Sequence, residues 1–326
     1  MNQPKEKYLG FCQNEDKIPI FSMPWWLDAV CGENNWDVIL IENGNEIVAS
    51  FPFYFHTESR LKFKQIEMPA LTQKLGPFIK YPEKQSYSSK LSYEKAIMQQ
   101  IIQCLPNYDF LAINFDYKYT NWLPFYWNGF QQTTRYTYIV EDLSNDEIVF
   151  NSFAGNKKTD IRKATKNVLV KYDLECEDFI TFYVNALKKK NENLAYSPSI
   201  LRKLITKAYF YNKGRIIYSV GKDNPNDIYG AIFYVWDNDS IYSLVTAFDV
   251  THGNVASSSL LFYQIMKDFK NSGLKFDFEG SMIEQIERSY NKFGTIQVPY
   301  FRISKINSLK YKIFSLLSEL RNEFRN

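Results

Sequence analysis

Two carboxylates in the second half of the chain are the first candidates for chemistry. The segment 274–279 alternates apolar and charged residues, so Asp277 and Glu279 share one face of an expected strand. Ligands of α/β proteins usually bind at the carboxyl ends of strands. Crowded like charges raise one carboxyl pKa toward the range of a general base. Glu279 is the preferred base because the turn Gly280-Ser281 follows it directly.

Arg302 offers a structural alternative for the same two carboxylates. It lies two residues after Tyr300, on one face of the expected last strand, 297–303. An arginine there could neutralise Asp277 and Glu279 as a structural ion pair without any catalysis. Both interpretations stay open from the sequence.

A second group of residues could bind phosphate. Residues 156–167 are rich in lysine and arginine, and in a helix Lys158, Arg162 and Lys166 form one stripe. Such a stripe can bind the phosphates of tRNA, of a nucleotide-linked precursor or of a lipid headgroup. An ordinary solvated helix face has the same pattern and is the alternative.

The segment 251–257, Thr-His-Gly-Asn-Val-Ala-Ser, precedes an expected helix and has small residues where a phosphate could approach. The candidates at this helix N-terminus are Gly253, Asn254, Ala256 and Ser257. His252 is expected to be a surface or capping residue, as a lone histidine in a turn usually is.

Composition excludes several kinds of site. Two histidines, four dispersed cysteines and the absence of a Gly-x-Ser-x-Gly segment argue against a serine–histidine triad, a multi-histidine metal centre and a disulfide framework. The net charge of +3 gives no case for DNA binding. No run of 18 apolar residues and no apolar signal region is present. We therefore expect a cytoplasmic protein with no metal and no tightly bound cofactor.

Element order predicts a duplicated α/β chain. The first half has a helix at 22–32, strands at 36–41, 46–55 and 64–69, a helix at 86–105, a strand at 110–114, a short aromatic segment and a strand at 134–140. The second half repeats this order, with helices at 146–167, 178–194 and 198–211, strands at 215–220, 228–236 and 240–248, a helix at 255–270, a strand at 274–278, a helix at 282–291 and a strand at 297–303.

Aromatic residues and a glycine, Gly129 or Gly294, lead into the last strand of each half. We predict two domains, 1–143 and 144–306, each with a mixed, mostly antiparallel sheet flanked by helices. An amphipathic helix is expected over 307–326, with one apolar stripe formed by Leu309, Ile313, Leu316, Leu317, Leu320 and Phe324. This stripe is expected to dock on its own domain, or else to contact a membrane surface or a second copy.

Several short segments of the second half suggest a family. They are Ile161-Arg162-Lys163-Ala164, Phe276-Asp277-Phe278-Glu279-Gly280-Ser281, Glu287-Arg288, Phe293-Gly294 and Pro299-Tyr300-Phe301-Arg302-Ile303. With them the chain resembles the FemAB-like branch of the GNAT acyltransferase superfamily, which implies tandem GNAT-like domains and a bacterial protein. The resemblance is incomplete at 251–257, because GNAT enzymes that use CoA usually carry Arg/Gln-x-x-Gly-x-Gly/Ala there.

The resemblance implies transfer of an acyl group from acyl-CoA, as co-substrate, to a small-molecule amine. Glu279 or Asp277 would take the amine proton, and Tyr290 or Tyr300 would protonate the leaving group. Ser281 and Arg302 would contact the substrate. One alternative is a Fem-type aminoacyltransferase that uses aminoacyl-tRNA and a cell-wall (peptidoglycan) precursor. Another is a binding protein that kept this fold and lost the chemistry.

Overall fold

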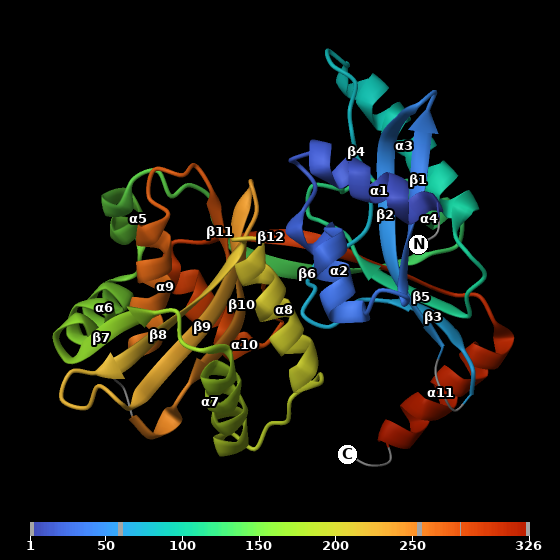
Figure 1. Cartoon of the computed structure of the whole chain (residues 1–326). Coiled ribbons are helices and arrows are strands. Elements are labelled where there is room, and N and C mark those ends of the chain that lie inside the picture. The colour runs from blue at the N-terminus through green and yellow to red at the C-terminus, as the bar shows by residue number, and fades with distance from the viewer. Residues whose placement is uncertain (1–2, 58–60, 253–255, 281, 324–326) are drawn as a thin grey trace. The chain divides into compact units, whose positions relative to one another are not determined.

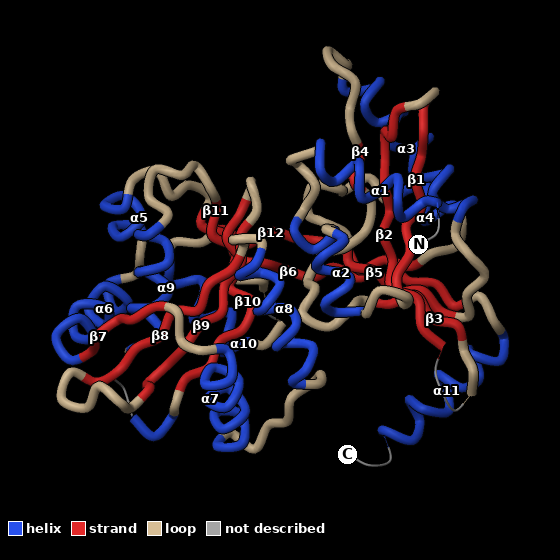
Figure 2. The backbone as a smooth tube through the Cα atoms, viewed as in Figure 1, coloured by secondary structure: helices blue, strands red, loops and turns tan. Residues whose placement is uncertain are grey.

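The computed structural model describes residues 3–57, 61–252, 256–280 and 282–323. The chain forms two compact units, one from residues 1–135 and 300–326 and the other from residues 136–299. Each unit is a mixed, mostly antiparallel sheet flanked by helices, which confirms the predicted fold class (Figures 1 and 2).

The first unit contains most of the elements of the first half. They are α1 (Gln3–Asn14), α2 (Pro24–Cys31), β1 (Trp36–Asn43), β2 (Glu46–Thr57), β3 (Lys64–Glu67), β4 (Phe78–Ile79), α3 (Tyr87–Cys104), β5 (Phe110–Asn114), α4 (Leu123–Trp127) and the start of β6 (Gln131–Val140). The helix α1 is not among the predicted elements. Its buried residues, Lys5, Tyr8 and Cys12, include a lysine, so the apolar period is weak.

The second unit begins within β6. Its elements are α5 (Asp146–Ser152), α6 (Gly155–Asn167), β7 (Val168–Tyr172), α7 (Cys176–Lys189), α8 (Pro198–Phe210), β8 (Gly214–Gly221), β9 (Ile228–Trp236), β10 (Ser240–Phe248), α9 (Ser257–Asp268), β11 (Lys275–Asp277), α10 (Glu284–Tyr290) and the start of β12 (Ile296–Ile306). The helix α11 (Leu309–Glu323) follows β12 and is counted with the first unit.

The single helix predicted over 146–167 is wrong, because α5 and α6 are separate helices. Phe153 between them has an extended backbone and is buried, with its ring centroid 5.3 Å from that of Phe293. The N–H of Ala154 donates to the carbonyl of Lys292 at 2.9 Å. The break therefore arises from packing against a distant segment, which local periodicity does not report.

The two halves share a strand pattern that supports the predicted duplication. In the first unit, β3 pairs with β5 in parallel, and in the second, β10 pairs with β11 in parallel. The final strands are exchanged: β6, from the first half, lies antiparallel to β11, and β12, from the second half, lies antiparallel to β5. Gly129 and Gly294, which precede these exchanged strands, both have a left-handed backbone.

Candidate active site

The two parallel strands of the second unit separate partway along their length. The pairing of β10 with β11 covers only residues 240–242 and 275–277, whereas β10 stays paired with β9 as far as Phe248. The register with β9 shifts between Ser243 and Val245, so Leu244 forms a bulge where the two parallel strands part. A bulge takes one residue's backbone groups out of the ladder. Among the described residues, β11 therefore has no partner residue for the edge of β10 over 243–248.

Ser243 lies beside this bulge with a buried hydroxyl. The residue is 5% exposed, and its Oγ makes no hydrogen bond to any described residue. Buried polar groups are nearly always paired, and those that are not call for an explanation such as a ligand or an ordered water. Ser243 thus marks a polar position where the two strands open.

Asp277 ends β11 and is fully buried. Its carboxylate accepts hydrogen bonds from the Thr137 hydroxyl and, at 2.8 Å, from the backbone N–H of Glu279. Glu279 and Gly280 then both adopt left-handed backbone conformations, with φ of 63° and 67°. Because Asp277 is buried and hydrogen-bonded in this way, it fixes the turn that contains Glu279.

Glu279 is half-buried and lies close to a group of tyrosines. Burial, with the nearby charges of Glu279 and Asp277, raises the pKa of Tyr290 to about 12. Burial also raises the pKa of Tyr196, and the tyrosine Tyr183 and the carboxylate of Glu279 add to the rise. The hydroxyl of Tyr196 donates to that of Tyr183 at 3.5 Å. Glu279 therefore has phenol groups around it that keep their protons at neutral pH.

The N-terminus of α9 is the part of the predicted phosphate site that the structure describes. Ala256 precedes the helix with a left-handed backbone (φ 54°) and gives it no side-chain cap. Ser257 and Ser259, in the first turn, are buried. The first N–H groups of a helix need partners, and a helix N-terminus attracts anions. Gly253 and Asn254 lie outside the described residues, as does Ser281.

Lys157 brings a buried cation to this helix end. It is 9% exposed, and its Nζ donates to Ser259 Oγ at 3.0 Å and to Ser289 Oγ at 3.4 Å. The same Nζ lies 4.7 Å from the ring centroid of Phe293. Burial lowers the pKa of Lys157, because the charged form loses hydration. Lys157 thus joins α6 to the first turn of α9 and to α10 beside Tyr290.

The basic stripe predicted for α6 does not point toward the N-terminus of α9. Lys158 Nζ donates to the carbonyl of Asn151 at 3.0 Å, and the guanidinium of Arg162 lies 5.5 Å from the Phe150 ring centroid. Lys166 is exposed. Two of the three side chains therefore contact α5 or its end, while Lys157, next to the stripe in sequence, reaches α9.

Tyr300 and Arg302 lie in the part of β12 that belongs to the first unit, where Arg302 pairs with Asn114 of β5. Of the predicted set, the second unit contains Asp277, Glu279, Tyr290, Ala256 and Ser257, and also the stripe Lys158, Arg162 and Lys166 of α6. It adds residues that the sequence interpretation missed, namely Lys157, Tyr183, Tyr196, Ser243 and Leu244. Of these, only Lys157 had a local signal, as part of a basic segment.

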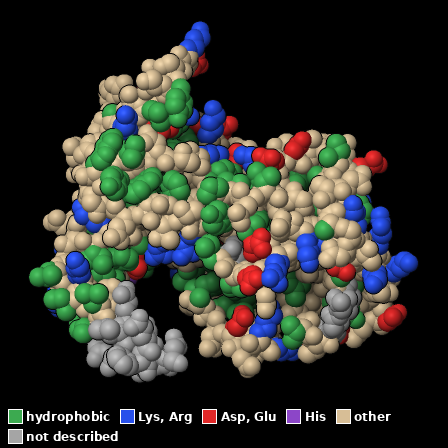
Figure 3. Space-filling model, turned by 180° about the vertical axis from the view of Figure 1, so that it is seen from behind, with side chains coloured by type: hydrophobic (Ala, Val, Ile, Leu, Met, Phe, Trp, Pro, Cys, Tyr) green, Lys and Arg blue, Asp and Glu red, His purple; other side chains and the backbone are tan. Residues whose placement is uncertain are grey.

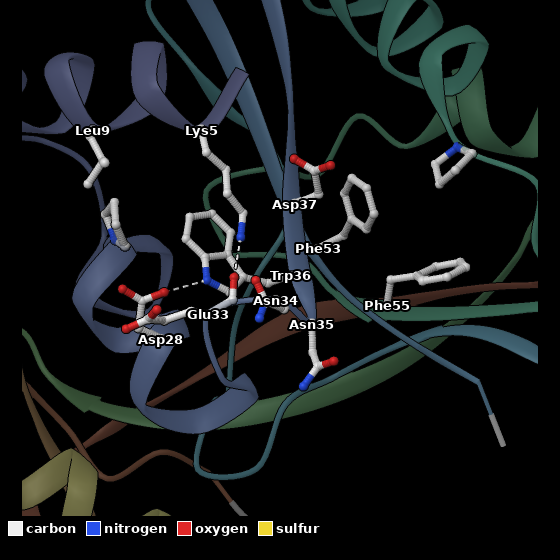
Figure 4. A pocket seen from close by; sticks show the side chains of 12 residues that line it. Lys5, Leu9, Asp28, Glu33, Asn34, Asn35, Trp36, Asp37, Phe53 and Phe55 are labelled. Atoms are coloured by element: carbon white, nitrogen blue, oxygen red, sulfur yellow. Dashed lines mark hydrogen bonds between the residues drawn. The ribbon is translucent and has the colours of Figure 1, made fainter. Parts of the chain in front are cut away.

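A separate cavity of about 630 Å³ lies in the first unit (Figure 4). The Nζ of Lys5 donates to the carbonyl of Glu33 at 2.5 Å and lies 4.1 Å from the Trp36 ring centroid. Trp36 Nε1 donates to Asp28 at 2.8 Å. Phe53, on β2, also lines this cavity. Two hydrogen bonds thus join polar groups of its lining, and no residue proposed for acyl transfer lines it.

Two kinds of feature are absent from the described residues. No group of three or more His, Cys, Asp or Glu side chains is arranged to hold a metal ion there. Among the helices of the described segments, none is both long and apolar enough to cross a bilayer.

The fold is similar to that of several solved structures. FemX matches with a TM-score of 0.66 and 12% identity over 92% of this chain and 96% of FemX. A conserved protein of unknown function from Bacteroides thetaiotaomicron matches with a TM-score of 0.60 and 9% identity, over 93% of this chain and 96% of its own. L-PGS from Bacillus licheniformis matches with a TM-score of 0.51 and 12% identity, over 95% and 94%. No family model and no curated protein sequence matches the chain.

Proposed function

The chain has the FemAB-like form of the GNAT fold, and from this premise we propose that it is an N-acyltransferase. The proposed reaction moves an acyl group from acyl-CoA to an amine, at the site of the second unit. The acceptor is a small-molecule amine or an amine of a cell-wall precursor.

The observation that carries this proposal is the parting of β10 from β11 at the Leu244 bulge. A strand edge without a partner binds extended, amide-bearing ligands by backbone hydrogen bonds. The arm of acyl-CoA is such a ligand, and the edge over residues 243–248 leads along the chain toward the uncapped N-terminus of α9. The phosphates of the donor would meet that helix end and Lys157.

Glu279 is the proposed general base. The attacking nitrogen forms a bond to the acyl carbon and loses a proton to the Glu279 carboxylate, which gives a tetrahedral intermediate, and the carbon–sulfur bond breaks when this intermediate collapses. The oxygen of the tetrahedral intermediate would accept hydrogen bonds from backbone groups released at the Leu244 bulge and from the Ser243 hydroxyl. The thiolate then leaves and takes its proton from water. Asp277 positions Glu279 through the bond to its N–H.

One observation favours the Fem-type alternative, in which aminoacyl-tRNA is the donor. Its leaving group is a ribose alkoxide, which is a much stronger base than a thiolate. Tyr290, with its pKa raised to about 12, is acidic enough to protonate that group. The same tyrosine is too weak an acid for an ordinary thiolate, whose pKa is about 8.5. The exposed Arg162, Lys163 and Lys166 of α6 would suit RNA phosphates.

Binding of CoA to the intact chain tests the first proposal. We expect CoA to raise the melting temperature and Lys157→Met to weaken its affinity about tenfold or more, since a charge-assisted contact is lost. Lys158→Met is the matched control and should bind CoA within about twofold of the parent chain.

Turnover separates the alternatives. Release of free thiol from acetyl-CoA with a panel of amines is expected if CoA is the donor. Transfer from radiolabelled aminoacyl-tRNA without thiol release would replace the first proposal by the Fem-type reaction. If neither donor binds nor reacts, the chain is a binding protein on this fold, and the enzymatic proposal is overturned.

A further inference from the structure

The helix α11 is held to the first unit by only one of its sides. Tyr311 stacks on Phe110, with ring centroids 5.0 Å apart and planes at 7°, and its ring meets Phe63 edge-on at 5.0 Å. Phe314 lies 5.3 Å from Phe63. Gln65 Nε2 also donates to the Tyr311 hydroxyl at 3.4 Å. These aromatic contacts dock the helix on β3 and β5.

The opposite side of α11 carries the apolar stripe that the sequence predicts, and the stripe is exposed. Leu309, Ile313, Leu316 and Leu317 are 73%, 51%, 53% and 62% exposed. They recur at the spacing of one helix face, whereas Tyr311 and Phe314 fall on the other. The expectation that this stripe docks on its own domain is therefore wrong for these four residues, while the side chains of Leu320 and Phe324 lie outside what the structure describes. We call these four residues the outer face of α11.

Two lysines of the helix flank the outer face. Lys310 and Lys312 are exposed on the helix itself, and Lys62 and Lys64 are exposed on either side of Phe63, which the helix covers. Lys310 Nζ lies 5.6 Å from the Phe63 ring centroid. Asp109, on the same side of the unit, accepts a hydrogen bond from the Lys64 N–H. Figure 3 shows hydrophobic and basic side chains gathered beside the grey residues at the lower left.

We propose that the outer face of α11 binds the surface of a membrane that contains anionic lipids. The apolar stripe would enter the boundary between headgroups and acyl chains, and Lys310 and Lys312, which flank it on the helix, would contact the lipid phosphates. Residues 308–326 contain four basic and two acidic residues, so the segment as a whole is also cationic. An apolar face combined with a cluster of basic residues gives the two signals that stable interfacial binding requires.

Size and charge favour a lipid surface over a second copy of the chain. A stable dimer buries about 800 Å² of surface on each partner. The four aliphatic side chains of the outer face are partly covered, so they supply only about half of that area. In a two-fold dimer through this face, the same lysines would also be brought near one another, and like charges repel. On anionic lipid, each of them meets opposite charge instead.

Co-sedimentation of the full chain with lipid vesicles tests the proposal. We expect binding to vesicles of phosphatidylcholine with phosphatidylglycerol, weakened at least tenfold on pure phosphatidylcholine or at high salt. The double variant Ile313→Ser, Leu317→Ser should lose binding by about tenfold or more, because both side chains point away from the protein. Phe210→Ser, which changes a 78% exposed aromatic residue of α8 in the second unit, should bind as the parent chain does.

Two results would overturn the proposal. One is equal binding of the parent chain and the double variant to anionic vesicles. The other is a dimer in size-exclusion chromatography with light scattering that the double variant converts to monomer, since the occupant is then a second copy. Binding of CoA is a separate measurement, and the double variant should leave it unchanged, so failure here does not affect the proposed acyl transfer.

Discussion

The helices α3 and α9 are counterparts, since each lies in sequence between the two parallel strands of its unit, yet they begin differently. Ser86 caps α3, and its hydroxyl accepts a hydrogen bond from the Ser89 N–H at 3.1 Å. Ala256 precedes α9 with a strained, left-handed backbone and no side-chain cap. The preceding strands differ too, because β3 spans four residues and β10 nine, with a bulge.

This difference agrees with a proposed site that lies in the second unit. In the first unit, the loop before α3 forms β4, which pairs with β2. In the second, no described residue of β11 pairs with β10 beyond Tyr242, no described side chain caps α9, and Lys157 adds a positive charge. Left-handed residues also precede α3, at Leu71 and Lys84, so the missing cap and the open strand edge, rather than backbone strain, distinguish the second unit.

Replacement of Glu279 by glutamine is expected to have the largest effect. Loss of a general base lowers turnover by about 10²- to 10⁴-fold, while CoA affinity should change little. Glu284→Gln, at an exposed carboxylate that pairs with Arg288 in the same unit, is the control. Steady-state thiol release measures both. Equal turnover in the two variants would remove Glu279 from the mechanism.

The paired glycines should respond unequally to alanine. A Cβ at Gly129 would meet nothing within 4 Å. Gly129→Ala should therefore lower the free energy of unfolding only by the cost of a left-handed alanine, about 1–2 kcal/mol. At Gly294 the Cβ would lie 2.1 Å from Ser152 Oγ, and overpacking adds about 1–3 kcal/mol. Urea unfolding followed by circular dichroism compares the two variants. Equal losses of stability would contradict the tighter packing at Gly294.

Alkaline pH should weaken the second unit through Tyr290. Its pKa in the folded chain is about 12, above the ordinary value of 10. Below pH 10 both states are protonated, and as pH rises beyond 10 only the unfolded state loses its proton, so stability falls by about 2 kcal/mol by pH 12.

Tyr290→Phe should remove the part of the alkaline loss of stability that Tyr290 causes. The comparison is Tyr126→Phe, at a 59% exposed tyrosine in the helix α4 of the first unit. Urea midpoints at pH 9 and pH 11.5 provide the measurement. A decline of the same size in Tyr290→Phe and in the parent chain would show that other groups cause it.

Substitutions at the starts of α3 and α9 should have the smallest effects on the free energy of unfolding, and the two effects should have opposite signs. Ser86→Ala removes the cap of α3 and should lower the free energy of unfolding by about 1 kcal/mol. Ala256→Gly relieves a left-handed alanine and should raise it by about 0.5–1 kcal/mol. Hydrogen exchange at the first turn of each helix localises the change. Stabilisation by both substitutions, or by neither, would break the contrast between the units.

Local patterns predict most of the fold. Alternation locates β8, β9 and β10, and Ser197 with Pro198 locates the start of α8, where the Ser197 hydroxyl caps the helix. The separation of α5 from α6 depends on Phe153 packing against Phe293, which lies far away in sequence. The strand β7 is also unpredicted, since its residues continue the helical pattern of α6.

The candidate site also has a part that local patterns predict and a part that depends on long-range packing. Glu279 is identified from its strand and the turn that follows it, both local features. Tyr196, which is bonded to Tyr183 of a remote helix, comes near it only through folding. Lys157 has the pattern of a surface residue, because a lysine among lysines gives no sign that its amine is buried. Long-range packing therefore determines the part of the site that the sequence alone does not predict.

The exchange of the last strands constrains how this chain can be made. Asn114 of β5 pairs with Arg302 of β12, so the first unit cannot complete its sheet until nearly the whole chain has left the ribosome. Contacts between residues so distant in sequence slow folding and leave a strand edge open to wrong partners meanwhile. A chain cut between the repeats should give two fragments that lack a strand each and regain a stable structure only when mixed.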